Sequence, residues 1–337
     1  MKTFCSCISM FILGCNISIG GYTFNRCTEV KIEKSIDLVS STAVIVLPIS
    51  AVLVSKGEKT TVETARLITV GMPVSIELSY NGIYSGIEYT GYVKVINHKI
   101  PLEIECENIY PLRKKNINKV WASTTLQDIL KEIVSGTDIT LSSEVPAITM
   151  SPYSIKNASG AFALQKLKDD FGLTVYLDES NRLYAGLAYT KSTGTVKYFL
   201  NGSNVNVINA DDLKYRNKED VLLKIKAIGV SGNNTRTEVE VGDQDGELRT
   251  LFFYNITSKT DLTRLATQQL NKLKFDGYEG KLLTFLIPKA VPGMTAILND
   301  ERFPVRSGNY YIDSVMTTWG TQGARREVGI GIKLQAS

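Results

Sequence analysis

The sequence predicts a mainly β fold in which two antiparallel β-barrel-like domains flank an α/β insert. Residues 72–107 contain three runs of alternating polar and apolar side chains, joined by turn residues rather than by helices. Such a pattern is typical of an antiparallel barrel or sandwich. Asn81-Gly82 supplies the positive-φ pair that a two-residue hairpin turn needs. Helical spacing of apolar residues begins only after Trp121, which sets the insert apart from the strands before it.

Length, composition and charge limit the classes of protein to be considered. With 337 residues, the chain can form two or three domains of roughly 100–200 residues each. It is 43% apolar and 21% charged, and its 16 tyrosines favour strands. The net charge of +4 is small for this length, and the densest basic run, Arg113-Lys114-Lys115 with Lys119 nearby, is interpreted as a solvated loop. These features do not indicate a dedicated nucleic-acid binder.

The N-terminal region supports two interpretations. Lys2 and the apolar run from Phe4 to Leu13 resemble a short signal peptide, and residues 12–15 resemble a lipoprotein cleavage box. Polar residues interrupt that run, however, and residues 16–24 alternate like a strand followed by a turn. We therefore predict an N-terminal extension over 1–9, with a first strand and its hairpin over 10–24.

The first β-barrel domain is predicted to cover residues 10–110. After the first hairpin, strands are expected at Glu29–Ile36 and at Thr42–Pro48. The polar segment Ser55–Leu67 is expected to form either a loop with one short helix or a flexible excursion. The three alternating runs described above complete the domain.

An α/β insert is predicted over residues 111–190. Thr124, with a glutamine three residues later, offers a cap for a helix whose apolar residues follow at helical spacing. A second helix is expected at Asn157–Phe171, with Phe162 on its apolar face and Gly172 at its C-terminal cap. Two strands complete a unit that is expected to have a core of its own.

The second β-barrel domain is predicted over residues 191–337 and includes one long helix. Its strands are expected at Val205–Ile208, Val221–Val230, Thr235–Val241, Leu248–Tyr254, Gly280–Ile287, Gly308–Thr317 and Arg325–Leu334. The helix, Ser258–Phe275, begins with a serine cap followed three residues later by Asp261. Residues 243–247 resemble the start of a calcium loop but lack the later ligands, so a hairpin turn is predicted instead.

The sequence shows no catalytic constellation, and we predict that the protein is not an enzyme. The one histidine, His98, lies in a polar segment that predicts an exposed turn, and no nucleophile motif accompanies it. Asp169 and Asp170 are adjacent at a helix end, so their side chains point about 100° apart and make poor catalytic partners. Motifs for phosphate loops and dinucleotide binding are absent. No catalytic, cofactor-binding or metal-binding residue is predicted, and no cofactor is expected.

The cysteines also argue against a metal or redox motif. They occupy positions 5, 7, 15, 27 and 106, and no pair has the C-x-x-C spacing. With a single histidine in the chain, a mixed zinc site lacks ligands. The expected state is that of free, mostly buried thiols in a reducing compartment.

Several segments, taken in their order along the chain, carry a resemblance to a known family. They are Ile17–Ser35, Thr42–Pro48, Gly71–Val74, Ile87–Val95, Pro101–Glu107, Thr125–Leu130, Asn157–Gly172, Val291–Gly293 and Gly308–Val315. This order resembles the late-control-D family of phage tail proteins. Its members are baseplate or tail-tip hub proteins, related to the hub part of type VI secretion spike proteins. The resemblance covers roughly residues 10–335.

The resemblance implies a virion structural protein of the injection machinery. Two barrels in each subunit of a homotrimer would form a pseudo-sixfold collar, a tail tube adaptor that joins the hexameric tube to a trimeric spike or fibre. The implied partners are further copies of the chain, the tail tube or distal tail ring protein, and the spike or fibre protein, with the tape measure protein as a further candidate. DNA would only pass through the lumen, and no membrane anchoring is implied. The implied location is the distal end of the tail, after assembly in the host bacterial cytoplasm.

Two other functions remain open from the sequence. Residues 1–15 suit a secreted or lipid-anchored bacterial surface β protein. A tail-associated cell-wall hydrolase is the third possibility, although no residue can be named for its chemistry.

A ring of subunits predicts that strand edges of one subunit pair with the next. Two segments are candidates for such edges, Thr42–Val46 and Val205–Val207. Five tyrosines are candidate anchors of the subunit contact: Tyr84, Tyr89, Tyr92, Tyr310 and Tyr311.

Overall fold

The computed structural model describes residues 12–55, 57–80, 83–150, 152–186, 192–230, 235–254, 256 and 258–334. The predicted extension at 1–9 and the predicted turn at Asn81-Gly82 lie outside these residues. The described chain divides into two compact units. Unit 1 comprises the residues up to 32 together with 43–107 and 317–325, and unit 2 comprises 33–42, 108–316 and the residues from 326 onward.

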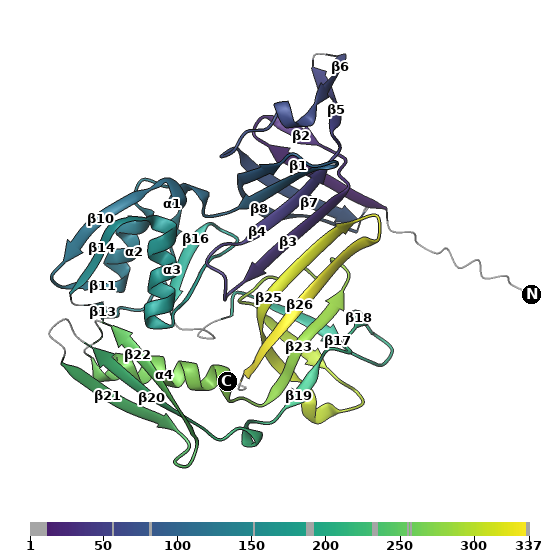
Figure 1. Ribbon diagram of the computed structural model, residues 1–337. Helices are drawn as coiled ribbons and strands as arrows, with labels where there is room; N and C mark the ends of the chain where they lie inside the picture. Colours follow the sequence, from purple (N-terminus) through teal and green to yellow (C-terminus); the bar gives the residue numbers. More distant parts are fainter. Residues whose placement is uncertain are drawn as a thin grey trace, which may run out of the picture. The chain divides into compact units, whose positions relative to one another are not determined.

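Unit 1 is built from antiparallel strands, whose alternating side chains form its buried face (Figure 1). Its elements are β1 (Leu13–Ile19), β2 (Tyr22–Phe24), β3 (Glu29–Ser35), β4 (Thr42–Leu47), β5 (Ser50–Ser55), β6 (Glu58–Glu63), a 3-10 turn (Thr64–Arg66), β7 (Pro73–Tyr80), β8 (Tyr84–Asn97) and β9 (Leu102–Glu107). The strand order is β3-β4-β9-β8-β7-β1-β2. Ile17 of β1 lies opposite Ile76 of β7, and both are fully buried. The strands predicted in residues 10–24 and 72–107 are therefore confirmed where the structure describes them.

The segment after Pro48 forms a hairpin that the sequence analysis missed. β5 pairs antiparallel with β6, and Gly57 takes a positive φ of 88° in the turn between them. The prediction of a loop or flexible excursion for Ser55–Leu67 was therefore wrong, apart from the 3-10 turn. Both faces of β6 are largely exposed, so its polar residues show no alternation. The remaining strand signal was the β-branched triplet at residues 60–62.

Unit 2 contains a second group of paired strands, which is mainly antiparallel. Its strands are β17 (Thr195–Phe199), β18 (Val207–Asn209), β19 (Lys214–Arg216), β23 (Gly277–Thr284), β24 (Thr295–Asn299), β25 (Gly308–Gly320) and β26 (Gly323–Leu334). β23 pairs antiparallel with β26 and with β18, and β24 pairs antiparallel with β25 and parallel with β17. Short 3-10 turns lie at Lys218–Asp220 and Pro304–Arg306.

The predicted insert is present as a small α/β arrangement within unit 2. Its elements are α1 (Tyr110–Lys114), β10 (Asn116–Trp121), β11 (Thr124–Thr125), α2 (Leu126–Val134), β12 (Thr140–Leu141), β13 (Thr149–Met150), β14 (Tyr153–Ser159), α3 (Gly160–Phe171), β15 (Thr174–Leu177) and β16 (Arg182–Gly186). The basic run at residues 113–115 forms the end of α1 rather than a loop. Lys115 donates a 2.7 Å hydrogen bond to Oγ of Ser135, the residue that ends α2, where a positive charge favours the helix dipole.

The two predicted helices of the insert, α2 and α3, start later than predicted. The cap of α2 is Thr125, whose Oγ1 accepts the N–H of Asp128 at 3.2 Å. α3 begins after Ser159, because the residues before it pair as β14 with β10. Gly172 ends α3 with a φ of 60°, as predicted. Phe162 is 60% exposed and was wrongly assigned to the apolar face, since it lies roughly 200° around the helix from the fully buried residue two positions later.

A three-stranded sheet and the long helix complete unit 2. The strands are β20 (Leu223–Val230), β21 (Arg236–Gly242) and β22 (Glu247–Tyr254), and the helix is α4 (Lys259–Leu273), which packs against β20 and β21 (Figure 1). β22 pairs with β20 in parallel, on the opposite edge from β21. Residues 243–246 therefore cross over the start of β20, and the predicted hairpin turn between β21 and β22 was wrong. Asp243 holds this crossing, because its carboxylate accepts the N–H of Leu223 at 2.9 Å while its own N–H donates to the carbonyl of Leu223.

Unit 2 has two large hydrophobic cores. The aliphatic core joins buried residues of the insert with buried residues of β20–β22 and α4, such as Leu130, Leu164, Ile225 and Leu265. The expectation that the insert has a core of its own was therefore incomplete, because helical spacing reveals an apolar face but not what covers it. The tyrosine core is formed by side chains of the second group of strands and the segments between them. It consists of Val196, Tyr198, Val207, Tyr278, Leu282, Ala290, Ala296, Leu298, Tyr310, Ile312, Val315, Val328 and Ile330.

The predicted fold class, mainly β with an α/β insert between two largely antiparallel β regions, is confirmed by this topology. The compact units follow other boundaries than the predicted ranges 10–110, 111–190 and 191–337, because the C-terminal hairpin contributes to both units. Within unit 1, for example, Tyr80 donates a 3.0 Å hydrogen bond to the carbonyl of Ala324. As separate domains, the three ranges stay a prediction.

None of the helices in the described residues is long and apolar enough to span a membrane.

Candidate assembly surfaces

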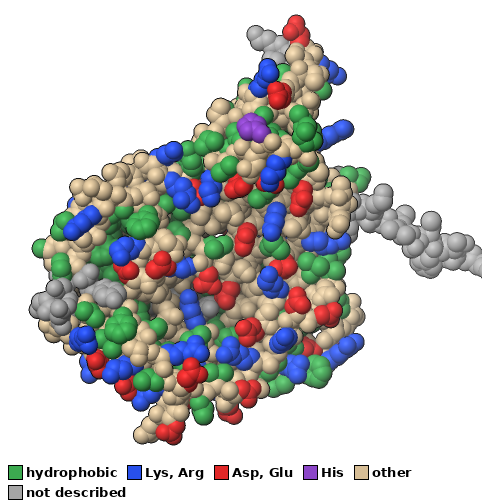
Figure 2. All heavy atoms as spheres, viewed as in Figure 1, with side chains coloured by type: hydrophobic (Ala, Val, Ile, Leu, Met, Phe, Trp, Pro, Cys, Tyr) green, Lys and Arg blue, Asp and Glu red, His purple; other side chains and the backbone are tan. Residues whose placement is uncertain are grey.

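The described residues offer little of what a catalytic site requires. They contain no cluster of three or more His, Cys, Asp or Glu side chains that could hold a metal ion. His98 lies in the connection between β8 and β9, and its exposed side chain is the purple group in Figure 2. The exposed turn predicted for His98 is thereby confirmed. Asp169 and Asp170 lie in the last turn of α3, and the second of them pairs with Lys166 at 2.7 Å.

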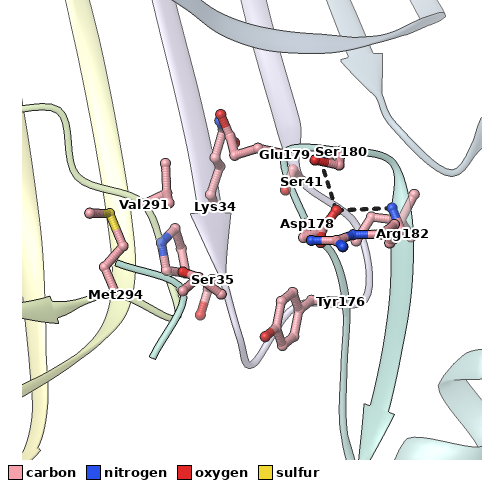
Figure 3. A pocket seen from close by; sticks show the side chains of 13 residues that line it. Lys34, Ser35, Ser41, Tyr176, Asp178, Glu179, Ser180, Arg182, Val291 and Met294 are labelled. Atoms are coloured by element: carbon pink, nitrogen blue, oxygen red, sulfur yellow. Dashed lines mark hydrogen bonds and ion pairs between the residues drawn. The ribbon is translucent and has the colours of Figure 1, made fainter. Parts of the chain in front are cut away.

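A small pocket in unit 2 lies where β3, the β15–β16 turn and residues 291–294 come together (Figure 3). Its volume of about 200 Å³ is below the roughly 300–1,000 Å³ of most ligand sites. Charged side chains line it, but they are paired with one another. Lys34 and Lys289 both pair with Glu179, the latter at 3.3 Å, and Arg182 pairs with Asp178 at 2.7 Å.

The ion pair between Lys34 and Glu179 joins β3 to the β15–β16 turn. Lys34 is only 11% exposed, so its ammonium group needs the carboxylate that the turn supplies. Asp178 also accepts the backbone N–H groups of Ser180 and Arg182, which shapes the turn that presents Glu179. The ion pairs therefore hold the β15–β16 turn of the insert against β3 within unit 2.

The hairpin β5–β6 of unit 1 carries exposed apolar side chains, and it extends away from β1 and β2 (Figure 1). Val52 and Val54 lie on one face of β5 and are 60% and 61% exposed. The two strands form a sheet of their own, and a lone two-stranded hairpin is marginally stable in water. A groove of about 740 Å³ lies beside the hairpin, between β5 and the edge strand β2. Exposed valines next to a strand edge suit contact with another protein chain.

Two segments were predicted to lie at strand edges. One prediction is confirmed and the other was wrong. β18 lies at an end of its sheet, and Val205 and Ile208 in this region are 48% and 40% exposed. The segment Val205–Val207 therefore borders a real edge. β4 pairs with β3 on one side and β9 on the other, so Thr42–Val46 has no free edge. A compact apolar strand is as consistent with the centre of a sheet as with its edge, which explains the error.

Most of the predicted tyrosine anchors point inward. Tyr89, Tyr310 and Tyr311 are buried within the subunit and cannot reach a partner, so those three assignments were wrong. Tyr84 and Tyr92 are half-buried. Sequence could not separate these cases, because tyrosine carries a large apolar ring as well as a hydroxyl and suits a core as well as a surface.

The charged surface is mixed in sign. On the face that Figure 2 shows, Lys and Arg side chains lie among Asp and Glu side chains rather than in one band. On β20 and β21, Lys224 pairs with Glu240 at 2.9 Å and Lys226 pairs with Glu238 at 2.7 Å across the two strands. Such cross-strand pairs neutralise the surface and do not form a phosphate-binding patch.

No family model and no curated protein matches the sequence. The fold, in contrast, matches solved structures over almost its whole length. A tail protein from Neisseria meningitidis MC58 is 13% identical, with a TM-score of 0.65 over 95% of this chain and 96% of that one. The 43 kDa tail protein of prophage MuSo2 from Shewanella oneidensis is 16% identical, with a TM-score of 0.62 over 95% and 98% of the two chains.

A type VI secretion component has the same fold. The E. coli c3393 protein, described as structurally similar to the T4 tail proteins gp27 and gp5, is 10% identical, with a TM-score of 0.56 over 95% of this chain and 77% of that one. The chain thus has the fold of phage tail proteins and of a type VI secretion component. The fold expected from the late-control-D resemblance is confirmed, and membership of that family stays a prediction.

Proposed function

We propose that this protein is a structural hub at the distal end of a phage tail, where a homotrimer adapts the hexameric tail tube to a trimeric spike or fibre. The observation that carries the proposal is that the structural match covers almost all of this chain and almost all of each relative. The chain and the two tail proteins match over 95–98% of their lengths, so they share the whole arrangement of β regions and insert rather than one common module.

The architecture suits a symmetry adaptor. Each subunit has two largely antiparallel β regions, so three subunits would present six such regions to a sixfold tube. The exposed hairpin β5–β6 and the edge strand β18 are surfaces that a neighbouring subunit could cover. A closed ring would remove these free edges, which is the general advantage of cyclic symmetry for β proteins.

The proposed partners are proteins of the same machine. They are two further copies of this chain, the tail tube or distal tail ring protein, and the spike or fibre protein, with the tape measure protein as a further candidate. A further structural relative belongs to a complex of PdpA with VgrG from Francisella, and this chain spans 54% of the matched chain there. DNA would pass through the lumen without a dedicated binding site, in line with the small net charge of +4.

The protein would act without catalysis. The charged groups of the small pocket are paired with one another, and His98 lies in an exposed turn. Assembly in the host bacterial cytoplasm and incorporation into the virion would then be its whole role, and an enzyme that opens the cell wall would be another chain.

Native mass spectrometry over a range of concentrations tests the proposal. We expect a monomer at low concentration and a trimer as the concentration rises, with threefold symmetry in electron micrographs of tail tips. A Val52→Glu/Val54→Glu variant should lower the trimer fraction at least tenfold, because it places charge in an apolar subunit contact. A hexamer, or a monomer at every concentration and in the tail, would contradict the proposal.

A matched control separates assembly from folding. Val120→Glu changes a valine of the insert that is 68% exposed, and we expect no effect on the trimer fraction. All three substitutions lie at exposed positions, so thermal unfolding of the monomer should change little. If Val120→Glu abolishes the trimer while the hairpin variant does not, the insert and not the hairpin forms the contact.

A further inference from the structure

Two thiols of unit 1 lie next to each other although twelve positions separate them in the chain. Cys15 lies on the buried face of β1, and Cys27 is half-buried in the connection between β2 and β3. Their Sγ atoms are 3.6 Å apart, and the thiol of Cys27 donates a hydrogen bond to the sulfur of Cys15. The spacing of the cysteines in the sequence did not indicate this pair.

The backbone holds both thiols in place. Cys15 pairs across the sheet with Leu78 of β7, in the middle of a seven-residue antiparallel register. The residue after Cys27, Thr28, donates its N–H to the carbonyl of Val46 at 2.8 Å. A disulfide bond needs the two sulfurs to come closer by only about 1.5 Å, which small side-chain rotations can supply.

The environment of the pair favours reaction, and that of the third described cysteine does not. The hydrogen bond from Cys27 lowers the pKa of Cys15 from its ordinary value in spite of burial, and the same bond raises the pKa of Cys27. Burial raises the pKa of Cys106 to about 12, and the nearby Glu105 adds to that effect. Because the thiolate is the reactive form, Cys106 should stay inert.

We propose that Cys15 and Cys27 are a disulfide-forming site, oxidised by a small disulfide such as oxidised glutathione. One thiolate of the pair attacks a sulfur of oxidised glutathione, and one molecule of glutathione leaves as its thiolate. The other thiol then loses its proton and attacks the mixed disulfide, so that the protein disulfide forms and a second glutathione leaves. The two thiol protons end on the two glutathione molecules, so the protein loses two electrons and the glutathione disulfide gains them.

The bond would fasten the first hairpin of unit 1 to the strand that follows it. In a reducing cytoplasm the thiols would stay free, and after release from the cell they would be oxidised. This biological timing rests on the proposed place of the protein in a virion. The chemical step itself does not, because it needs only the geometry within one chain.

The test uses a Cys5→Ser/Cys7→Ser variant, so that only the three described cysteines remain. The folded protein is incubated with oxidised glutathione, then denatured, and its free thiols are alkylated before digestion with trypsin. Cleavage after Arg26 separates the two cysteines, so the proposal predicts a disulfide between peptides 3–26 and 27–31. Cys106 should be alkylated in the same sample and serves as the internal control.

A stability measurement accompanies the mass spectrometry. Oxidation should raise Tm by about 5 °C, and a reductant should reverse the change. A further Cys27→Ser substitution, at the half-buried position, should abolish both the linked peptide and the Tm shift while the protein still folds. Full alkylation of all three cysteines, or glutathione left bound to one of the pair, would overturn the proposal. The disulfide test does not depend on whether the chain forms a trimer. Each of the two proposals can therefore fail without the other.

Discussion

The two cores of unit 2 are built on different principles. The aliphatic core, which joins the insert to α4 and β20–β22, is dominated by Leu, Ile and Val. The tyrosine core buries Tyr198, Tyr278 and Tyr310 beside its aliphatic side chains, and two charged residues are buried near it. Arg326 is fully buried and donates to the carbonyl of Ala290 at 3.1 Å. Asp300 is 5% exposed and accepts the hydroxyl of Tyr278 at 2.6 Å.

This difference shows how each core specifies its structure. Burial of apolar area has no preferred direction, so helices and strands of the insert, β20–β22 and α4 can share the aliphatic core. Hydrogen bonds are directional, and Asp300 accepts one from the amide of Asn201 at 2.8 Å as well as from the N–H of Phe303 at 2.9 Å. The stability of the tyrosine core therefore depends on a few hydrogen bonds in addition to its buried apolar area. The predictions below separate these two contributions.

The largest effect is expected from a cavity in the aliphatic core. Leu265 on α4 is 1% exposed, and Leu265→Ala should lower the free energy of unfolding by about 2–5 kcal/mol. Chemical denaturation followed by circular dichroism measures the change. The control is Phe162→Ala on α3, a larger truncation at an exposed position, which should cost less than about 0.5 kcal/mol. Equal losses in the two variants would contradict the assignment of the buried faces.

A smaller effect is expected from a single hydroxyl in the tyrosine core. Tyr278→Phe keeps the ring but removes the hydrogen bond to the Asp300 carboxylate, and it should cost about 1.5–3 kcal/mol. The control is Tyr215→Phe, which keeps a ring packed edge-on against Tyr278 at 5.6 Å and should change stability by less than about 0.5 kcal/mol. Similar effects in both variants would mean that the bond to Asp300 is not the source of the stability.

The smallest expected effect is a dependence on pH. Burial opposes ionisation of Asp300, but hydrogen bonds from Tyr278, Asn201 and two backbone N–H groups outweigh it and hold the pKa of this carboxyl below its ordinary value. A lowered folded-state pKa contributes stability that is present above the unfolded pKa of about 3.9 and is lost as the pH falls through the folded value. The stability gap between the wild type and Asp300→Asn should therefore shrink between pH 5 and pH 2.

Urea unfolding of both proteins at each pH measures this gap, and the other carboxyl groups cancel in the difference. A gap that stays constant or widens on acidification would show that the stabilising contacts of Asp300 do not depend on its charge. No such pH-dependent gap is expected between the wild type and Leu265→Ala, because a cavity in an aliphatic core carries no titratable group.

The sequence by itself determined the local structure wherever a pattern has only one physical cause. Alternation in residues 72–107 placed one side of each strand in the interior, and the structure confirms those strands. Ser258 caps α4 by accepting the N–H of Asp261, as its spacing predicted. Gly172 ends α3 because a residue without Cβ tolerates a positive φ. Each of these signals acts within a few residues, so neighbouring side chains suffice to produce it.

Only the tertiary structure decided which segments became partners. Backbone hydrogen bonds are the same for every residue, so the pattern of β20 could not show that β22 would pair with it in parallel. Nothing in the apolar strand β4 distinguished a central position from an edge, and nothing in three tyrosines distinguished a core from a contact surface. The same holds for Cys15 and Cys27, which meet because the β1–β2 hairpin returns the chain to the side of β1. Which segments pair with one another depends on packing over the whole unit. The residues that determine this packing lie far apart in the chain.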